Sequence, residues 1–229
     1  MRKVIFLYFI FFILSSALSY SQIKQTGLPF IRNHERDEFR GGRQSWDVAQ
    51  SDQNLIYFAN NSGILEFDGK DWKLYPVTNR SVVRSVATGK NGKIYAGAYN
   101  EFGYLHKKAN GESVYHSLMN KVPEDYKNFG EIWKIFTTDN GVIFQSFSNV
   151  LFYKDYQINV LSDNGQFHFS FYVNGSLYIS EEDKGLMKYN GQRFEQVEGG
   201  QFFSNEQRVW SIFEFKPGKL LIGTQNDGL

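Results

Sequence analysis

The sequence feature that most constrains the fold is a unit of four short strands separated by tight turns, first seen in residues 44–72 (QSWDVAQSDQNLIYFANNSGILEFDGKDW). Apolar residues alternate in WDVAQ and again in LIYFA, as expected for strands with one buried face. Asn, Asp, Ser and Gly residues, which favour turns, separate these runs. Because a four-stranded meander cannot bury both of its faces alone, the unit predicts further copies along the chain.

Further copies do follow, and each contains two residues eleven positions apart on either side of a turn. The pairs are Trp46 with Tyr57, Arg84 with Tyr95, Trp133 with Phe144, Phe167 with Tyr178, and Trp210 with Leu221. Their first positions are on average 41 residues apart, which is the length of a four-stranded propeller blade. A glycine follows the second strand in four copies, where a turn needs positive φ or a close backbone approach. We therefore predict an all-β fold, a β-propeller of four-stranded antiparallel blades, with Arg84 opposite Tyr95.

The repeat also predicts where the blades lie. They are expected near residues 44–76, 82–118, 131–162, 166–197 and 208–229, after an N-terminal segment of residues 22–43. The last copy stops before its third strand, so we expect four blades and part of a fifth in what looks like a fragment of a longer protein. A propeller closes by pairing its last blade with its first. The apolar patch at 28–31 is the candidate closing strand, and residues 121–130 are expected to connect two blades, with one helical turn.

Residues 1–21 have the pattern of a secretory signal peptide. Arg2 and Lys3 form a basic start, an unbroken apolar run covers positions 4–14, and small or polar residues precede Gln22. The apolar run is short for a bilayer span, which favours a cleaved peptide over the alternative, an uncleaved N-terminal anchor. The chain has no cysteine, so its own core must hold an exported domain together. These features predict a periplasmic or cell-envelope location.

Charge and motifs exclude several function classes. Loss of residues 1–21 would change the formal net charge from +1 to −1, and a near-neutral chain has no electrostatic footprint for nucleic acid. The sequence contains no P-loop, G-x-S-x-G or H-E-x-x-H motif. The histidines are scattered, without the clustered ligands of a zinc site; they are His34, His106, His116 and His168. We therefore expect no metal, no cofactor and no catalytic residue.

Four residues are nominated as ligand-binding candidates, namely Trp46, Arg84, Trp133 and Trp210. The first strand of a propeller blade lines the central channel, so aromatic side chains there could stack on a sugar ring. The alternative is packing between blades, since large aromatic side chains dominate core energetics. A different reading uses carboxylates as the acid and base of a glycosidase. Its candidates are Asp47, Glu66, Asp68 and Glu101, of which Asp68 lies in an Asp-Gly turn and favours a structural role.

The fifth copy, VWSIFEFKPGKLLIGTQNDGL, resembles the two-component regulator propeller repeat, with its Trp-containing first strand, turn, apolar strand ending in Gly-Thr, and Gly-Leu. The segments QSWDVAQSDQNLIYFANNSGILEFDG and VRSVATGKNGKIYAGAYNEFGYL are similar to the first two blades of such sensors from the Bacteroidetes group. The resemblance covers about residues 27–229 and is loose in the third and fourth copies. In that family the propeller precedes a three-tyrosine domain, a membrane helix and a histidine kinase or LuxR-type helix-turn-helix output.

This resemblance implies a non-catalytic, periplasmic sensor portion of a signal-transduction regulator that controls transcription. It also implies an unidentified small ligand, with a glycan or oligosaccharide as the candidate, and a homodimer as one state of the full-length parent. The competing class is a secreted carbohydrate-active propeller enzyme or glycan-binding protein. Carboxylates that face each other across the channel at glycosidase separation would favour that enzyme.

Overall fold

The structure is a computed structural model that describes residues 27, 31–90, 92–162, 167–204, 207–226 and 228. The chain divides into two compact units, one ending at His34 and one spanning Glu35–Leu229. All strands within the described residues belong to the second unit. The expected signal peptide at 1–21 and positions 28–30 of the candidate closing strand lie outside the described residues.

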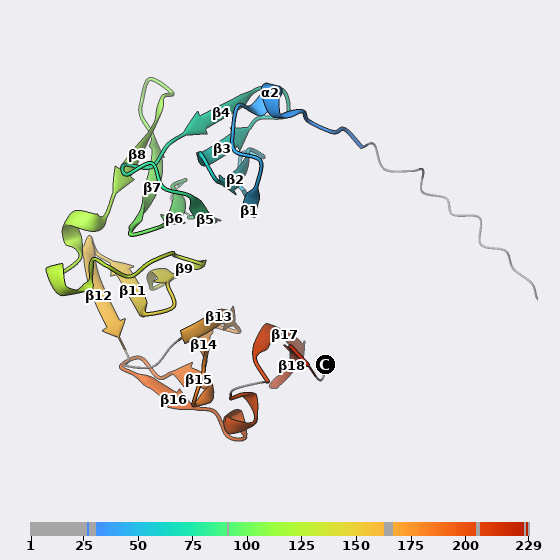
Figure 1. Ribbon diagram of the computed structural model, residues 1–229, viewed down its shortest axis with the longest axis vertical. Helices are drawn as coiled ribbons and strands as arrows, with labels where there is room; N and C mark the ends of the chain where they lie inside the picture. The colour runs from blue at the N-terminus through green and yellow to red at the C-terminus, as the bar shows by residue number, and fades with distance from the viewer. Residues whose placement is uncertain are drawn as a thin grey trace, which may run out of the picture. The chain divides into compact units, whose positions relative to one another are not determined.

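The described residues of the second unit form four sheets of four antiparallel strands and one sheet of two strands (Figure 1). Blade 1 has β1 (Ser45–Gln50), β2 (Ile56–Asn60), β3 (Gly63–Phe67) and β4 (Trp72–Tyr75). Blade 2 has β5 (Val83–Thr88), β6 (Ile94–Ala98), β7 (Glu101–Lys107) and β8 (Ser113–Ser117). Blade 3 has β9 (Lys134–Thr138), β10 (Gly141–Gln145), β11 (Asn149–Lys154) and β12 (Gln157–Ser162). Blade 4 has β13 (Phe167–Val173), β14 (Ser176–Glu181), β15 (Gly185–Tyr189) and β16 (Phe194–Gln196), and blade 5 has β17 (Val209–Lys216) and β18 (Lys219–Thr224).

Helices are few and short in the described part of the chain. They are α2 (Arg36–Phe39), η1 (Met119–Lys121), η2 (Glu124–Tyr126) and η3 (Gly200–Phe203). No helix within the described ranges is long and apolar enough to cross a membrane. The predicted fold class, all-β with four blades and part of a fifth, is confirmed, and the two short 3₁₀ helices η1 and η2 lie in or beside the expected connecting segment at 121–130.

Turn chemistry explains why the strands begin and end where they do. In blade 1 a two-residue turn joins Asn60 to Gly63, which pair across β2 and β3. Gly63 has a φ of +138°, and a Cβ there would lie 2.5 Å from the Tyr75 carbonyl oxygen on β4. Only glycine fits this position without strain. Glycine at the start of β3 therefore allows this strand to approach the end of β4 closely.

The strand register corrects one sequence-based expectation. Arg84 does not lie opposite Tyr95, because Tyr95 pairs with Ala87 instead. Arg84 is instead the extra residue of a β-bulge between Val83 and Ser85, which pair with Ala98 and Gly97 at the end of β6. Equivalent irregularities occur at the start of β1, β13 and β17. In blade 4 the irregularity puts His168, rather than the predicted Phe167, at the position of Trp46.

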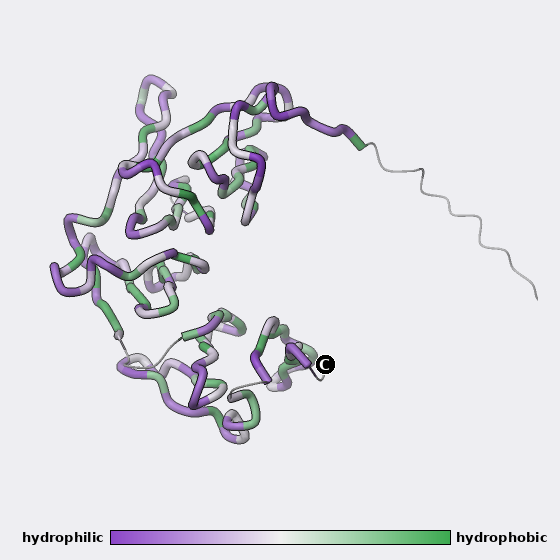
Figure 2. Tube along the Cα trace, in the orientation of Figure 1, coloured by the Kyte–Doolittle hydropathy of each residue, from purple (hydrophilic) through white to green (hydrophobic). Residues whose placement is uncertain are grey.

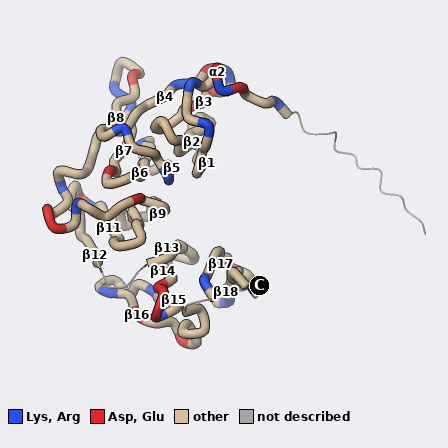
Figure 3. Tube along the Cα trace, in the orientation of Figure 1, with Lys and Arg blue, Asp and Glu red and all other residues tan. Residues whose placement is uncertain are grey.

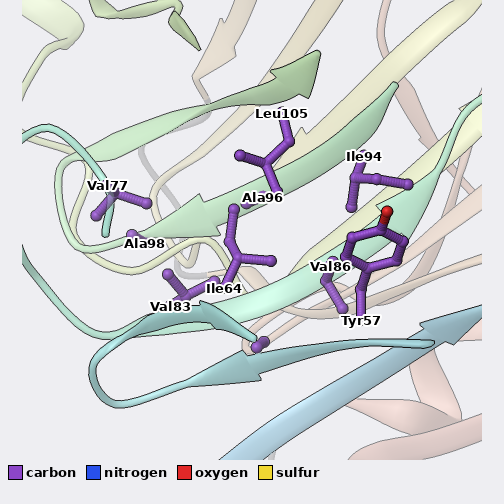
Figure 4. Close-up of a cluster of buried hydrophobic side chains, with 10 residues drawn as sticks. Tyr57, Ile64, Val77, Val83, Val86, Ile94, Ala96, Ala98 and Leu105 are labelled. Atoms are coloured by element: carbon purple, nitrogen blue, oxygen red, sulfur yellow. The ribbon is translucent and has the colours of Figure 1, made fainter. Parts of the chain in front are cut away.

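The hydrophobic cores lie between neighbouring blades rather than inside one. In the cluster of Figure 4, Tyr57 and Ile64 of blade 1 pack against Val86, Ala96 and Leu105 of blade 2. Similar clusters join blade 2 to blade 3, blade 3 to blade 4, and blade 4 to blade 5. Hydrophobic and hydrophilic segments accordingly alternate along each blade (Figure 2). Each sheet thus buries its faces against the next copy, as the repeat predicts.

The first strands β1, β5, β9, β13 and β17 lie next to one another in that order, each at the inner edge of its sheet (Figure 1). Hydrogen bonds link β1 to β5, and β5 to the residues just before β9. The Val86 amide donates to Asp47 Oδ2 (3.1 Å), and Ser85 Oγ donates to the Ile132 carbonyl (2.7 Å). These bonds set the relative position of successive first strands, and therefore of the side chains at their starts.

Candidate functional site

The candidate site is a line of side chains at one end of the blades, where the second and third strands are joined by turns. Each member lies at or directly before the start of a first strand, except Phe147, which lies in the turn between the second and third strands of blade 3. We call them the aromatic row, namely Trp46, Arg84, Trp133, Phe147, His168, Phe169 and Trp210. All four residues nominated from the sequence belong to it.

The blade 1 to blade 3 part of the row is centred on a cation. The guanidinium carbon of Arg84 lies 3.8 Å from the ring centroid of Trp46 and 5.0 Å from that of Trp133. The two indoles meet edge to face with centroids 6.0 Å apart. Glu131 Oε1 accepts bonds from Arg84 Nε (2.8 Å) and Nη2 (2.6 Å). The carboxylate therefore holds the guanidinium between the two rings in cation–π geometry.

The row continues through rings from blade 3 to blade 5. Trp133 stacks on Phe147, with centroids 5.6 Å apart, and Phe147 lies parallel to His168 at 6.1 Å. His168 and Phe169 then contact Trp210, with centroid distances of 5.3 Å and 5.4 Å. Side chains from separate repeats thus form one continuous line of ring contacts.

The row differs from the core in exposure. Trp46, Phe147 and Trp210 are 37%, 40% and 50% exposed, whereas the core rings of Phe102 and Phe144 are fully buried. The inter-blade packing considered from the sequence is therefore real, since the rings touch across blades, but it leaves ring faces open. Exposed aromatic patches of this kind mark interaction sites.

A pocket of about 240 Å³ opens beside the row; we call it the blade 4–5 pocket. Its lining consists of Phe147, Phe167, His168, Ser180, Glu181, Glu182, Phe203 and Arg208. Two ion pairs balance its acids, Glu181 with Lys184 (2.7 Å) and Glu182 with Arg208 (3.1 Å). Burial lowers the pKa of His168, and the nearby Arg208 lowers it further. The imidazole is therefore neutral at neutral pH.

The carboxylates proposed as a glycosidase pair have structural hydrogen bonds instead. Glu66 is buried and accepts from Tyr57 (3.0 Å), and Asp68 accepts backbone bonds within its own turn. Glu101 accepts from the Ser117 hydroxyl (2.7 Å), and burial raises its pKa. Asp47 Oδ2 accepts a hydrogen bond from the Val86 amide.

A second hollow, of about 380 Å³, lies among the first strands of blades 1 to 4. No acidic side chain lines it; its lining is Ala49, Gln50, Val86, Ala87, Thr88, Ile135, Phe136, Thr137 and Tyr172. Charges of both signs are spread over the described chain rather than gathered in one region (Figure 3). The described residues also contain no group of three or more His, Cys, Asp or Glu side chains that could hold a metal ion.

Comparison with solved structures shows the fold. The extracellular domain of a Bacteroides thetaiotaomicron protein, described as the one-component system BT4673, matches with a TM-score of 0.61 and 16% identity. The alignment covers 89% of this chain and 27% of that one. This chain is a β-propeller. The propeller also matches the extracellular domain of BT3049, described as a hybrid two-component system from the same organism, with a TM-score of 0.59 and 16% identity over 91% of this chain and 28% of that one.

A third similar structure is an enzyme, virginiamycin B lyase from Staphylococcus aureus, with a TM-score of 0.59 and 12% identity. That alignment covers 82% of this propeller and 64% of the lyase. The propeller thus spans less than two thirds of each of these proteins, and at such identities the likeness establishes the fold alone. No protein-family model matches the sequence, and a search of curated proteins gives no match.

Sequence reasoning missed several residues of the site. His168 has no clustered ligands in the sequence that would indicate a metal site, and the eleven-residue spacing gives its neighbour Phe167 as the first position of the fourth copy. Glu131 and Glu181 carry no motif, since each is placed by contacts between blades. Phe147 lies in the turn between β10 and β11, and the equivalent turn of blade 1 holds Asn61, which accepts from Trp46 Nε1 (2.8 Å). Aligning the copies on the turn between their second and third strands, rather than on the eleven-residue spacing, points to both His168 and Phe147.

Proposed function

We propose that this propeller is the ligand-sensing part of an exported signal-transduction protein, and that the aromatic row binds the ligand. The observation that carries the proposal is the row itself, because it joins partly exposed rings from separate blades into one surface. The similarity in fold to extracellular domains of Bacteroides signalling systems supports the sensor class. The signal-peptide pattern at residues 1–21 supports a periplasmic location.

The ligand class that suits the row is an oligosaccharide. Flat indole and phenyl faces suit the apolar faces of sugar rings, and several rings in line suit a chain of sugars. Arg84, Glu131 and Asn61 supply polar atoms beside the rings. In this proposal a separate output module responds to ligand binding and controls transcription, and the propeller performs no chemistry itself.

Tryptophan fluorescence tests the proposal, because three of the four tryptophans lie in the row. The fourth, Trp72, stacks on Phe67 in blade 1 with centroids 4.4 Å apart. In a Trp72→Phe background, all indole emission comes from the row. We expect at least one member of a panel of neutral disaccharides to hexasaccharides to change this emission in a saturable way.

Variants then locate the bound sugar. Trp210→Ala and Trp46→Ala are each expected to weaken binding about tenfold or more, by analogy with nucleobase stacking, where loss of one aromatic side chain costs roughly 1–3 kcal/mol. Tyr156→Ala is the matched control, because Tyr156 is 72% exposed but lies in the turn between β11 and β12, at the other end of blade 3. Equal binding by the row variants and the wild type would contradict the proposal.

A second candidate function is a carbohydrate-active enzyme, favoured by the similarity in fold to a lyase and by a histidine and two glutamates in one pocket. Prolonged incubation with the same oligosaccharides, followed by mass spectrometry, separates the two candidates. A sensor leaves the sugars intact. Cleavage that is lost in the His168→Phe variant would assign the pocket to catalysis.

A further inference from the structure

Buried polar atoms without a hydrogen-bond partner gather at the end of the blades that carries the row. Within the described residues they are Arg84 Nη1, His168 Nδ1, Glu181 Oε2 and Gln207 Oε1. Native proteins satisfy most buried polar atoms, so each exception needs a reason, and an absent ligand is one. Two of the four atoms belong to residues that line the blade 4–5 pocket, namely His168 and Glu181.

Glu181 presents an unused acceptor there. The residue is 1% exposed and stands at the end of β14, at the position that Asn60 holds in blade 1. Asn60 uses both of its amide atoms, donating to the Gly42 and Gln44 carbonyls and accepting from the Gly42 amide. Glu181 pairs with Lys184 through Oε1 only, which leaves Oε2 as an acceptor for a ligand donor.

His168 presents a second buried atom without a partner, its Nδ1. Burial keeps the imidazole neutral. A nitrogen of a neutral imidazole either donates or accepts a hydrogen bond, and a ligand hydroxyl can complete the bond in both cases. The pocket therefore has an unpartnered acceptor on Glu181 and an unpartnered nitrogen on His168, and a hydroxyl can bond to each.

The charge of the pocket defines the ligand further. Its two glutamates are already paired with Lys184 and Arg208, so a ligand needs no positive charge to balance them. A carboxylate on the ligand would bring negative charge beside an unpaired carboxylate oxygen, and would provide no donor. The phenyl rings of Phe147, Phe167 and Phe203 supply the rest of the wall.

We propose that the blade 4–5 pocket is the specificity subsite of the row, and that it holds an uncharged group with two hydroxyls, one that donates to Glu181 Oε2 and one that hydrogen-bonds to His168 Nδ1. A neutral sugar ring with free hydroxyls fits this description, and a carboxylate in this position does not. The inference rests on the proposed function and deepens it. The row provides stacking, while the pocket distinguishes neutral ligands from acidic ones.

Binding of matched neutral and acidic probes tests the subsite in the wild-type chain. Cellobiose, xylobiose, maltose and galactobiose are compared with digalacturonate and cellobiouronate by titration calorimetry. We expect at least one neutral disaccharide to bind at least tenfold more tightly than either uronate. Monodeoxy derivatives of the tightest probe should include one that loses tenfold or more. Tighter uronate binding, or binding by no probe, overturns the proposal.

Two substitutions test the two named residues. Glu181→Gln and His168→Phe are each expected to weaken the neutral probe at least tenfold, with Glu214→Gln and His106→Phe as exposed controls that bind normally. Circular dichroism checks folding, and the deoxy series needs no variant if one fails to fold. Loss of binding by Trp46→Ala and Trp210→Ala, with normal binding by Glu181→Gln and His168→Phe, would overturn the subsite and leave the proposed function standing.

Discussion

Replacement of Arg84 by alanine tests whether the row also holds blades 1, 2 and 3 together. Arg84 lies on β5, contacts an indole from the start of blade 1 and another from the start of blade 3, and pairs with Glu131. Its side chain is 16% exposed and that of Glu131 is 26% exposed. The substitution thus removes two cation–π contacts and leaves a half-buried carboxylate unpaired.

The expected loss follows from these contacts. A cation–π contact contributes about 0.5–1 kcal/mol when exposed and about 2 kcal/mol when desolvated, and a hydrogen bond to a charged group contributes about 1.5–3 kcal/mol. Because the group is partly solvated, we expect Arg84→Ala to lower the free energy of unfolding by about 2–4 kcal/mol. Arg84→Lys keeps the charge but loses the planar fork, so about half of that loss is expected.

Urea denaturation followed by circular dichroism measures the free energy of unfolding. The wild type, Arg84→Ala, Glu131→Ala and the double variant together form a double-mutant cycle. The cycle should give a coupling energy of about 1 kcal/mol or more, since the two side chains are in direct contact. A loss below about 0.5 kcal/mol for Arg84→Ala would refute the reasoning, because it would mean that the guanidinium is not held between the rings.

Three other predictions concern stability. Phe144→Ala should cost about 3–5 kcal/mol because the ring is fully buried, whereas Trp210→Ala should cost less than about 1.5 kcal/mol because half of that side chain is already exposed; equal losses in urea denaturation would contradict this. Gly63→Ala should cost about 1–3 kcal/mol or more from strain at a φ of +138°, and an unchanged thermal midpoint would show that the turn relaxes freely. The folded-state pKa of His168 lies below its usual value of 6.5, so the unfolded state binds protons more readily as pH falls below 6.5. The wild type should lose stability over that range relative to His168→Phe, and parallel pH profiles would contradict the assignment.

The blade pattern could be predicted from the sequence because it is encoded locally. Alternating residues and Asn-Gly or Asp-Gly turns specify hairpins within about ten residues of chain. A repeat then implies stacking of one copy on the next. Trp46, Trp133 and Trp210 stood out for the same reason, since each is a large aromatic residue at an equivalent place in its copy.

The remaining part of the site could not be predicted because it depends on contacts between copies. A bulge adds one residue to a strand, and the sequence does not mark where it occurs. Phe167 and His168 are adjacent, and only the register shows that the first is buried and the second takes the place of Trp46. The partners Arg84 and Glu131 are 47 residues apart, so no local pattern joins them.

The most direct test of the central claim is a ¹H–¹⁵N spectrum of the four indole N–H groups, recorded during titration with the oligosaccharide panel. If the row is the ligand-binding face, the resonances of Trp46 and Trp210 move in a saturable way while that of Trp72, on the outer strand of blade 1, stays in place. Movement of the Trp72 resonance with those of Trp46 and Trp210 unchanged, or no movement with any member of the panel, would contradict the account.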